Sequence, residues 1–425
     1  MILDKKQKEI VESDSKDILV IAGAGSGKTR VLVERVRHLI EVKQVEPQEL
    51  ICVTFTNAAA DEMRERLQDV QGIGDAFIGT IHSFANRIYK ESGETYQLLT
   101  TEVEMRLMKE ILSDNEFIHL TYDKFLEYLD TISEIEKGNE DPTLGDPFNY
   151  FTPSELSNWM EAQKRLGSLR KERGIITFDE LLDRTREYFA TLDTDVQHVM
   201  LDEAQDVGLR EYQFVSGLDS KNTFIVGDDW QNIYSWKGAD VSIFKNIAED
   251  PNVTVYKMEN NYRSAESIVA FSRSIIKQVP DRIEKNVNIV SDLKGSVKVD
   301  SKYMVDEYLK EIAKKPDEFN DWFVLCRTNT DVYTIANKLR EMHVPVDTFK
   351  RSNLTKEEME LRMALPTVKV ITVHTAKGLE NKNVLVYGNF PLKLASWQKS
   401  KSNFEERRVF YVAASRAEEN LIVLN

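Results

Sequence analysis

The chain has 425 residues and a formal net charge of −15, with 41% hydrophobic and 30% charged residues. This composition is that of an ordinary globular protein with room for about two or three domains. The sequence has no apolar stretch of membrane-spanning length and no signal-peptide core at its start, so we expect a cytoplasmic protein without membrane association. The acidic balance excludes a general nucleic-acid binder, but not a local groove of basic and aromatic side chains.

The two cysteines, Cys52 and Cys326, each lie inside an apolar run typical of a strand. Such surroundings favour small buried hydrophobic side chains over a disulfide or a metal site. The sequence therefore predicts a reducing, intracellular setting.

A glycine-rich segment follows the first apolar run. Residues 17–21 predict a buried strand, and apolar residues recur at helical spacing from Val31 to Ile40. A glycine-rich turn between a strand and a helix aims backbone N–H groups at an anion, and the helix N-terminus adds partial positive charge. Lys28 can reach the β- and γ-phosphates of a nucleotide, and the Thr29 hydroxyl can ligate Mg²⁺. The predicted phosphate-binding loop comprises Ala22, Gly23, Ala24, Gly25, Ser26, Gly27, Lys28 and Thr29, with Ala22 where the strict pattern has glycine.

Apolar runs alternate with helical patterns along most of the chain. The strand-like runs are residues 50–56, 199–202, 223–227, 253–258, 322–326, 368–373, 384–387 and 421–424. This alternation predicts parallel sheets covered by helices. A charged, strand-poor stretch predicts a helical insertion. We expect a first lobe of residues 1–90 and 176–258, a helical insertion of residues 91–175, and a second lobe of residues 259–425.

Two carboxylates stand where the apolar run of residues 199–201 ends. Ligands of parallel α/β sheets bind at the carboxyl ends of the strands. We expect Asp202 to hold Mg²⁺ and Glu203 to orient and activate the water that attacks the γ-phosphate. An acidic turn without function is the alternative, which the upstream phosphate-binding loop disfavours.

Residues 227–239 read Gly-Asp-Asp-Trp-Gln-Asn-Ile-Tyr-Ser-Trp-Lys-Gly-Ala after another buried run. Gln231 has a neutral side chain able to sense a γ-phosphate. Tyr234 and Trp236 could form a platform for a nucleobase. Core packing is the alternative, and for Tyr234 it is about equally favoured.

These segments, in this order, resemble the motifs of superfamily 1 helicases of the UvrD/Rep/PcrA branch, from Gln7 to Arg416. The resemblance implies an α/β protein of two RecA-like P-loop NTPase lobes, with a helical insertion in the first lobe. It also implies ATP and Mg²⁺ between the lobes and a motor that hydrolyses ATP while moving 3′→5′ along DNA. The expected partners are single-stranded DNA or tailed duplex DNA, and the expected core is monomeric.

The resemblance gives further residues roles toward the nucleotide. Gln7 would read adenine, Arg30 would contact the nucleotide, and Tyr262 would stack on adenine. Glu380 would bind the ribose. The implied catalytic residues are Lys28, Asp202, Glu203, Gln231, Arg263 and Arg416. Two arginine fingers from the second lobe would make hydrolysis depend on closure of the lobes. Structural ion pairs are the alternative for Arg263 and Arg408.

The resemblance also implies residues that contact DNA. They are Thr54, Phe55, Asn57, His82, Phe84, Tyr234, Trp236, Thr372 and His374. Ala58 stands where the family often has Lys, and Asn381 where it has an aromatic residue. Satisfied core or surface histidines are the alternative for His82 and His374. A basic cluster of Lys164, Arg165, Arg170, Lys171 and Arg173 is expected either to guide a phosphate backbone or to form a solvated helix face.

The chain departs from the family between Ser264 and Val370, where there is room for little more than a helix pair beyond the expected strands. We therefore expect the family's second large insertion to be absent, together with the β-hairpin that follows the last motif. A pared-down motor that needs a protein partner to open duplex DNA is one consequence. The alternatives are an ATP-switched nucleic-acid clamp and an RNA motor.

Overall fold

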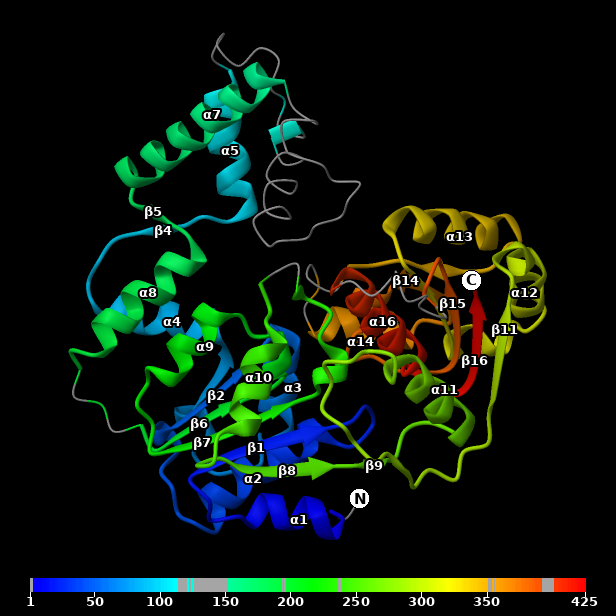
Figure 1. The fold of residues 1–425 in the computed structure, drawn as a ribbon, viewed down its shortest axis with the longest axis horizontal. Helices are drawn as coiled ribbons and strands as arrows, with labels where there is room; N and C mark the ends of the chain where they lie inside the picture. Colours follow the sequence, from blue (N-terminus) through cyan, green and yellow to red (C-terminus); the bar gives the residue numbers. More distant parts are fainter. Residues whose placement is uncertain are drawn as a thin grey trace. The chain divides into compact units, whose positions relative to one another are not determined.

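The computed structural model describes residues 3–113, 121, 124–125, 152–192, 194, 196–235, 238–350, 354, 356–391 and 401–425. The chain divides into two compact units: residues Met1–Ile81 with Thr194–Asn425, and residues His82–Asp193. The first unit contains two six-stranded sheets, each with helices around it (Figure 1).

The first sheet is parallel throughout. Its strands, in spatial order, are β3 (Phe77–Thr80), β2 (Leu50–Thr54), β6 (His198–Leu201), β7 (Asn222–Gly227), β1 (Asp17–Ala22) and β8 (Thr254–Met258). β1 and β2 are almost fully buried, as expected of strands covered on both faces. The predicted strands are confirmed. β3 was not predicted, because its four residues include a glycine and form too short an apolar run.

Helices and short 3₁₀ turns precede or connect these strands. They are α1 (Lys5–Glu12), α2 (Lys28–Glu41), η1 (Pro47–Glu49), α3 (Asn57–Arg66), η2 (Ile73–Asp75), η5 (Ala204–Asp206), α9 (Leu209–Ser216), η6 (Asp229–Gln231) and α10 (Val241–Glu249). The apolar spacing predicted for residues 31–40 is that of α2, where Val31, Leu32, Val36 and Leu39 are buried. Their cluster also includes Ile18 and Val20 of β1, so α2 packs on the strand that leads into the phosphate-binding loop.

The second sheet is also parallel. Its strands, in spatial order, are β11 (Ser296–Asp300), β16 (Ala417–Leu424), β15 (Asn381–Tyr387), β12 (Trp322–Cys326), β14 (Val368–Thr372) and β13 (Val346–Asp347). The helical elements are α11 (Glu266–Ile276), η8 (Lys302–Met304), α12 (Val305–Ala313), η9 (Pro316–Asp321), α13 (Asn329–Glu341), α14 (Lys356–Ala364), α15 (Val373–Ala376) and α16 (Lys401–Ala414). A short pair, β9 (Asn260–Asn261) and β10 (Asn288–Ile289), precedes β11. Two α/β lobes are thereby confirmed.

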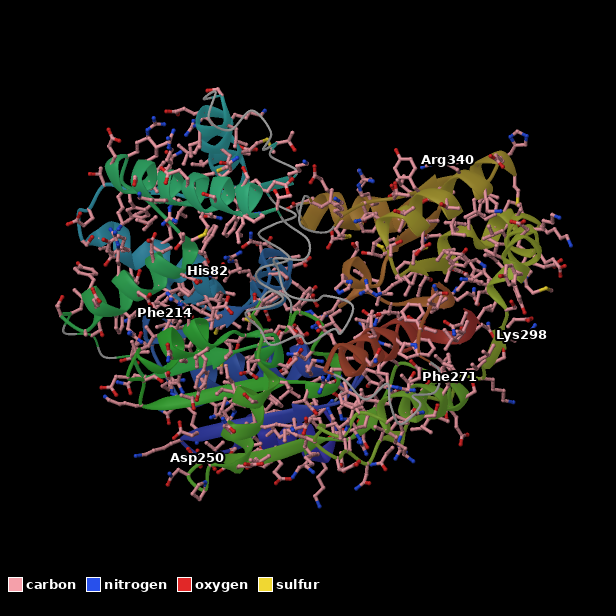
Figure 2. The ribbon with its side chains drawn as sticks, turned by 45° about the horizontal axis from the view of Figure 1, so that its top comes forward. His82, Phe214, Asp250, Phe271, Lys298 and Arg340 are labelled. Carbon is pink, nitrogen blue, oxygen red and sulfur yellow. The ribbon has the colours of Figure 1, made fainter. Side chains whose placement is uncertain are left out.

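Apolar side chains of α11 and α16 pack on the second sheet. Phe271, labelled in Figure 2, meets Phe410 edge-on with 5.9 Å between ring centroids.

Both cysteines are reduced and buried. Cys326 lies in the core on the opposite face of the second sheet, and Cys52 lies in the core of the first lobe. Burial raises the pKa of Cys52 to about 12. The prediction that both cysteines are small buried side chains is confirmed.

The second unit is helical, with α4 (Ile81–Glu91), α5 (Thr101–Leu112), α7 (Pro153–Glu172), α8 (Phe178–Phe189) and the short pair β4 (Gln97–Leu98) and β5 (Ile175–Ile176). Capping boxes start α7 at Thr152 and α8 at Thr177. This unit extends beyond residues 91–175 because α8 bonds to α4 through the Thr185 hydroxyl and the Ala85 carbonyl oxygen. The division of the first lobe at residues 90 and 176 stays a prediction.

Among the helices that the structure describes, none combines the length and apolar character needed to span a bilayer.

Candidate nucleotide and DNA site

The loop between β1 and α2 has the conformation of a phosphate-binding turn. Gly25 and Gly27 adopt left-handed φ angles of 69° and 85°. The Ser26 hydroxyl donates to the Gly23 carbonyl oxygen at 2.8 Å, and the Asn261 amide donates to the Ala24 carbonyl oxygen at 2.7 Å. Successive glycines of this kind turn backbone N–H groups inward, which fits a phosphate group.

Ala22 does not disturb this loop. It is the last residue of β1 and pairs with Met258 of β8. Because strand backbone suits any L-residue, the position needs no glycine. The departure from the strict pattern therefore leaves the loop geometry intact.

Asp202 and Glu203 follow β6 directly. Glu203 adopts a left-handed conformation with φ 52° and ψ 40°, and its N–H donates to Asp202 Oδ1 at 2.9 Å. A non-glycine residue in this region is uncommon and is typical of functional turns. Burial and the Glu203 charge raise the pKa of Asp202. Burial alone would raise the pKa of Glu203, but Lys28 and Lys377 lower it and favour the carboxylate.

The residues expected to hold Mg²⁺ suit a nucleotide-bound ion. Thr29 lies in the first turn of α2, and Asp202 directly follows β6. One hydroxyl and one carboxylate, completed by phosphates and water, is a common arrangement for Mg²⁺. The part of the chain described here contains no group of three His, Cys, Asp or Glu side chains able to hold a metal on its own. This donor set fits a metal that binds together with its nucleotide.

Gln231 lies at the centre of a buried polar network. Its amide nitrogen donates to Asp228 Oδ2 at 2.6 Å, and its amide oxygen accepts from Arg416 Nη2 at 3.0 Å. Gln205 joins the network, accepting from the Asp228 N–H at 2.8 Å and donating to Glu203 Oε2 at 2.5 Å. The structure therefore connects three of the predicted catalytic residues, Glu203, Gln231 and Arg416, through hydrogen bonds.

Arg416 comes from the turn after α16 and is 1% exposed. It also donates to the carbonyl oxygens of Val412 and Leu379 at 3.1 and 3.3 Å. Burial, together with repulsion from Arg263, lowers the pKa of Arg416 to about 10. The guanidinium therefore stays charged at neutral pH, as an arginine finger requires.

Arg263 and Glu380 form an ion pair with each other. Arg263 Nη1 also lies 3.5 Å from the Ser415 carbonyl oxygen. The structural pairing considered for Arg263 is therefore present, and its predicted contact with the nucleotide stays a prediction. Arg408 likewise bonds within the protein, to the Asp281 carbonyl oxygen at 3.2 Å.

Gln7, the residue expected to read adenine, lines a hollow of about 180 Å³ together with Asp4 and with Ser26 of the phosphate-binding loop. Gln7 accepts from the Asp4 N–H and donates to the Ser26 carbonyl oxygen, both at 3.0 Å. Tyr262 is 37% exposed, and its hydroxyl donates to Asp4. Asp4, which the sequence did not single out, thus contacts both the expected base reader and the expected stacking ring.

Several residues expected to contact DNA lie together in the first unit. Phe55 stacks on Tyr234 with ring centroids 5.1 Å apart, and Tyr234 lies 6.1 Å from the His374 ring. Thr372 caps α15 through the Thr375 N–H. Tyr234 is partly buried against the second-lobe core, so both interpretations offered for it have support.

The remaining expected DNA contacts differ in their surroundings. Thr54 is buried and its hydroxyl donates to the Thr56 carbonyl oxygen, whereas Asn57 is exposed at the start of α3. His82, labelled in Figure 2, belongs to the second unit and meets Phe178 edge-on at 5.2 Å. Phe84 is buried in that unit. Trp236 lies outside the described residues.

The basic cluster on α7 is paired with carboxylates of the second unit. Arg173 bonds to Glu110, Arg170 to Glu180, and Arg165 to Glu161. Such pairing is typical of a solvated helix face, and it supports that alternative over a track for a phosphate backbone.

Two buried lysines belong to the site although neither is among the predicted site residues. Lys377 donates to Asp206 and to the Gln231 carbonyl oxygen, and it lies 4.8 Å from the Tyr234 ring centre. Lys285 bonds to both Asp228 and Asp229. Lys377 lies inside a motif that could have drawn attention to it. Lys285 follows no recognisable pattern.

Known proteins resemble the chain over its whole length. Residues 3–252 match a family model described as the UvrD/REP helicase N-terminal domain, and residues 256–359 and 348–425 match one described as the UvrD-like helicase C-terminal domain. A "Probable DNA helicase" of Mycoplasma pneumoniae is 29% identical over 100% of this chain and 83% of its own length. "DNA helicase II" of Haemophilus influenzae is 28% identical over 87% of this chain, and "ATP-dependent DNA helicase PcrA" of Bacillus subtilis is 31% identical over 67%. The match covers only 54% and 41% of the lengths of these two relatives.

Proposed function

Because the chain belongs to the UvrD/REP helicase family, a family of ATP-dependent DNA helicases, we propose that it couples ATP hydrolysis to 3′→5′ movement along single-stranded DNA and separates duplex strands. Its substrates are ATP with Mg²⁺ and single-stranded or tailed duplex DNA. The observation that carries this proposal is the bond from Arg416 of the second lobe to Gln231 of the first lobe, at 3.0 Å.

The residues of the first lobe provide the hydrolytic groups. Lys28 stabilises charge on the β- and γ-phosphates, and Glu203, whose ionised form Lys28 and Lys377 favour, takes the proton of the attacking water. When bound, Mg²⁺ neutralises phosphate charge, and Thr29 and Asp202 are the residues that would hold it. Gln231 senses the γ-phosphate.

The residues of the second lobe make hydrolysis depend on the arrangement of both lobes. Arg416 stabilises charge that develops on the transferred phosphoryl group, with Arg263 as the second finger. Since Gln231 and Arg416 are hydrogen-bonded across the two lobes, a shift of one lobe changes the position of both groups. Such a dependence links turnover to movement.

Phe55 and Tyr234 provide the nucleobase platform. Their rings stack on each other, and Lys377 lies over the Tyr234 ring while it bonds to Asp206. Asp206 in turn accepts from the Gln205 amide at 3.3 Å, and Gln205 holds Glu203. A base that binds at Tyr234 is therefore connected to the water-activating carboxylate through Lys377, Asp206 and Gln205.

Replacing Glu203 with Gln tests the assignment directly. The variant should bind ATP but lose DNA-stimulated hydrolysis by about a hundredfold or more, because an amide cannot accept the proton of water. Steady-state phosphate release with and without single-stranded DNA measures this. Glu249→Gln, at the exposed end of α10, removes the same charge elsewhere and should leave turnover unchanged. Wild-type turnover in Glu203→Gln would contradict the assignment.

An ATP-switched clamp is the second candidate, and one observation favours it. The described residues between Ser264 and Val370 form only elements of the second lobe, from α11 to the start of β14. Among them is no further helical domain of the kind we expected to be absent. A clamp of this type would need a protein partner for duplex opening, and it would show strand-stimulated hydrolysis without strand displacement.

A further inference from the structure

A segment of the second lobe returns to the first lobe after α11. We call residues 281–287 the return segment. The Ile283 N–H donates to Asp229 Oδ2 at 2.7 Å, and the Trp230 indole N–H donates to the Ile283 carbonyl oxygen at 2.9 Å. Lys257 Nζ bonds to the Glu284 carbonyl oxygen at 2.8 Å. The return segment is therefore attached to η6, the turn that carries Gln231.

Lys285 is the buried centre of this attachment. Its side chain is fully buried, and its ammonium bonds to Asp228 Oδ1, to Asp229 Oδ1 at 2.8 Å and to the Ala22 carbonyl oxygen at 3.3 Å. It also lies 4.5 Å from the centre of the Trp230 ring. Burial alone would lower the pKa of Lys285, but Asp228 and Asp229 outweigh it and raise the pKa above its ordinary value.

Asp228 also bonds to two glutamines of the hydrolytic network, Gln231 and Gln205. Its Oδ2 accepts from the Gln231 amide at 2.6 Å, and its N–H donates to the Gln205 amide oxygen at 2.8 Å. Gln231 then meets Arg416, and Gln205 meets Glu203. Asp228, whose carboxylate is held by the Lys285 ammonium, thus contacts Gln231 through its side chain and Gln205 through its backbone N–H.

We infer that Lys285 is a positioning residue for ATP hydrolysis: it fixes Asp228, and Asp228 fixes Gln231 and Gln205. This inference rests on the proposed function. Without the ammonium, two buried carboxylates would face each other without a cation, which is unfavourable unless one moves or takes up a proton. Either response changes the acceptor that orients Gln231. In the proposed reaction, Lys285 touches neither the phosphates nor the attacking water.

Lys285→Met keeps the length of the side chain and removes its charge. We expect kcat for strand-stimulated ATP hydrolysis to fall about tenfold to a hundredfold, because small displacements of catalytic groups have effects of that size. The KM for ATP should change by less than about threefold, because the phosphate-binding loop is intact. Rates are normalised to the folded fraction measured by circular dichroism.

Two comparisons separate positioning from a loss of stability. Lys369→Met removes another fully buried lysine, one that bonds to Asn320 and to the carbonyl oxygens of Leu365 and Thr367. It should destabilise the fold yet leave kcat of the folded protein unchanged. In a Gln231→Ala background, Lys285→Met should reduce kcat by less than about a further twofold, because the effects of residues that act through one another are not additive.

The outcomes distinguish this inference from the proposed function. Normal kcat in Lys285→Met, or a full additional loss in the Gln231→Ala background, overturns the role of Lys285 while the helicase proposal stands. A wild-type protein that does not hydrolyse ATP with any single-stranded DNA overturns the proposed function, and the role of Lys285 with it.

Discussion

Gly25 is the glycine of the phosphate-binding loop at which an added Cβ would make the closest contacts. A Cβ there would lie 2.7 Å from Arg263 Cβ and 2.8 Å from Asn261 Nδ2, at a φ of 69°. We expect Gly25→Ala to abolish measurable ATP binding, since the left-handed conformation alone costs about 1–2 kcal/mol and the contacts add to it. Titration with a fluorescent ATP analogue measures the effect.

Gly74→Ala is the matched control, because a Cβ at Gly74 meets nothing within 4 Å. It should bind the analogue as the wild type does. Equal affinity of Gly25→Ala and wild type would show that the loop does not adopt this conformation when it binds a nucleotide.

Among individual residues, the sequence predicted those whose chemistry follows from a local pattern. The phosphate-binding loop and the Asp202–Glu203 turn lie next to buried strands, so their positions could be inferred. Lys285 could not, because its two carboxylate partners lie far away in the sequence. Phe84 shows the same limit, because its position in the sequence did not reveal that its ring is buried.

The first helix links secondary structure to the expected base site. Asp4 caps α1 in a capping box with Gln7, and its second oxygen accepts from Tyr262 and from Asn260. Asp4→Ala should cost about 1 kcal/mol of helix stability and raise the KM for ATP several-fold, because the Gln7 backbone N–H and the Tyr262 hydroxyl each lose their acceptor. Steady-state kinetics and thermal unfolding give the two quantities.

Thr100→Ala removes a comparable cap from α5 in the second unit, where Thr100 accepts from the Val103 N–H. We expect it to lower stability by a similar amount with no change in KM. An unchanged KM in Asp4→Ala would mean that Asp4 serves the helix alone.

Elements were predictable where apolar runs were long enough. The run 322–326 is β12, and the helical spacing of residues 31–40 is that of α2. β11 was not predicted, because its residues alternate with charged ones and are mostly exposed at the sheet edge. Its place depends on pairing with β16, a contact between distant parts of the chain.

On the scale of the whole molecule, the proposed coupling of hydrolysis to movement depends on contacts that join the two lobes. Arg416 to Gln231, Lys377 to Asp206 and Lys285 to Asp228 all connect a second-lobe side chain to the turns that follow β6 and β7. The order of motifs predicted two α/β lobes. The side chains that meet between the lobes could be identified only from the three-dimensional structure.

The most direct test is strand displacement and ATP hydrolysis measured together on a duplex with either a 3′ or a 5′ single-stranded tail, with Glu203→Gln in parallel. We expect hydrolysis to rise with both tailed substrates and the labelled strand to leave only the 3′-tailed duplex, in wild type alone. Displacement from the 5′-tailed duplex, or tail-stimulated hydrolysis with no displacement from either, would contradict a 3′→5′ helicase.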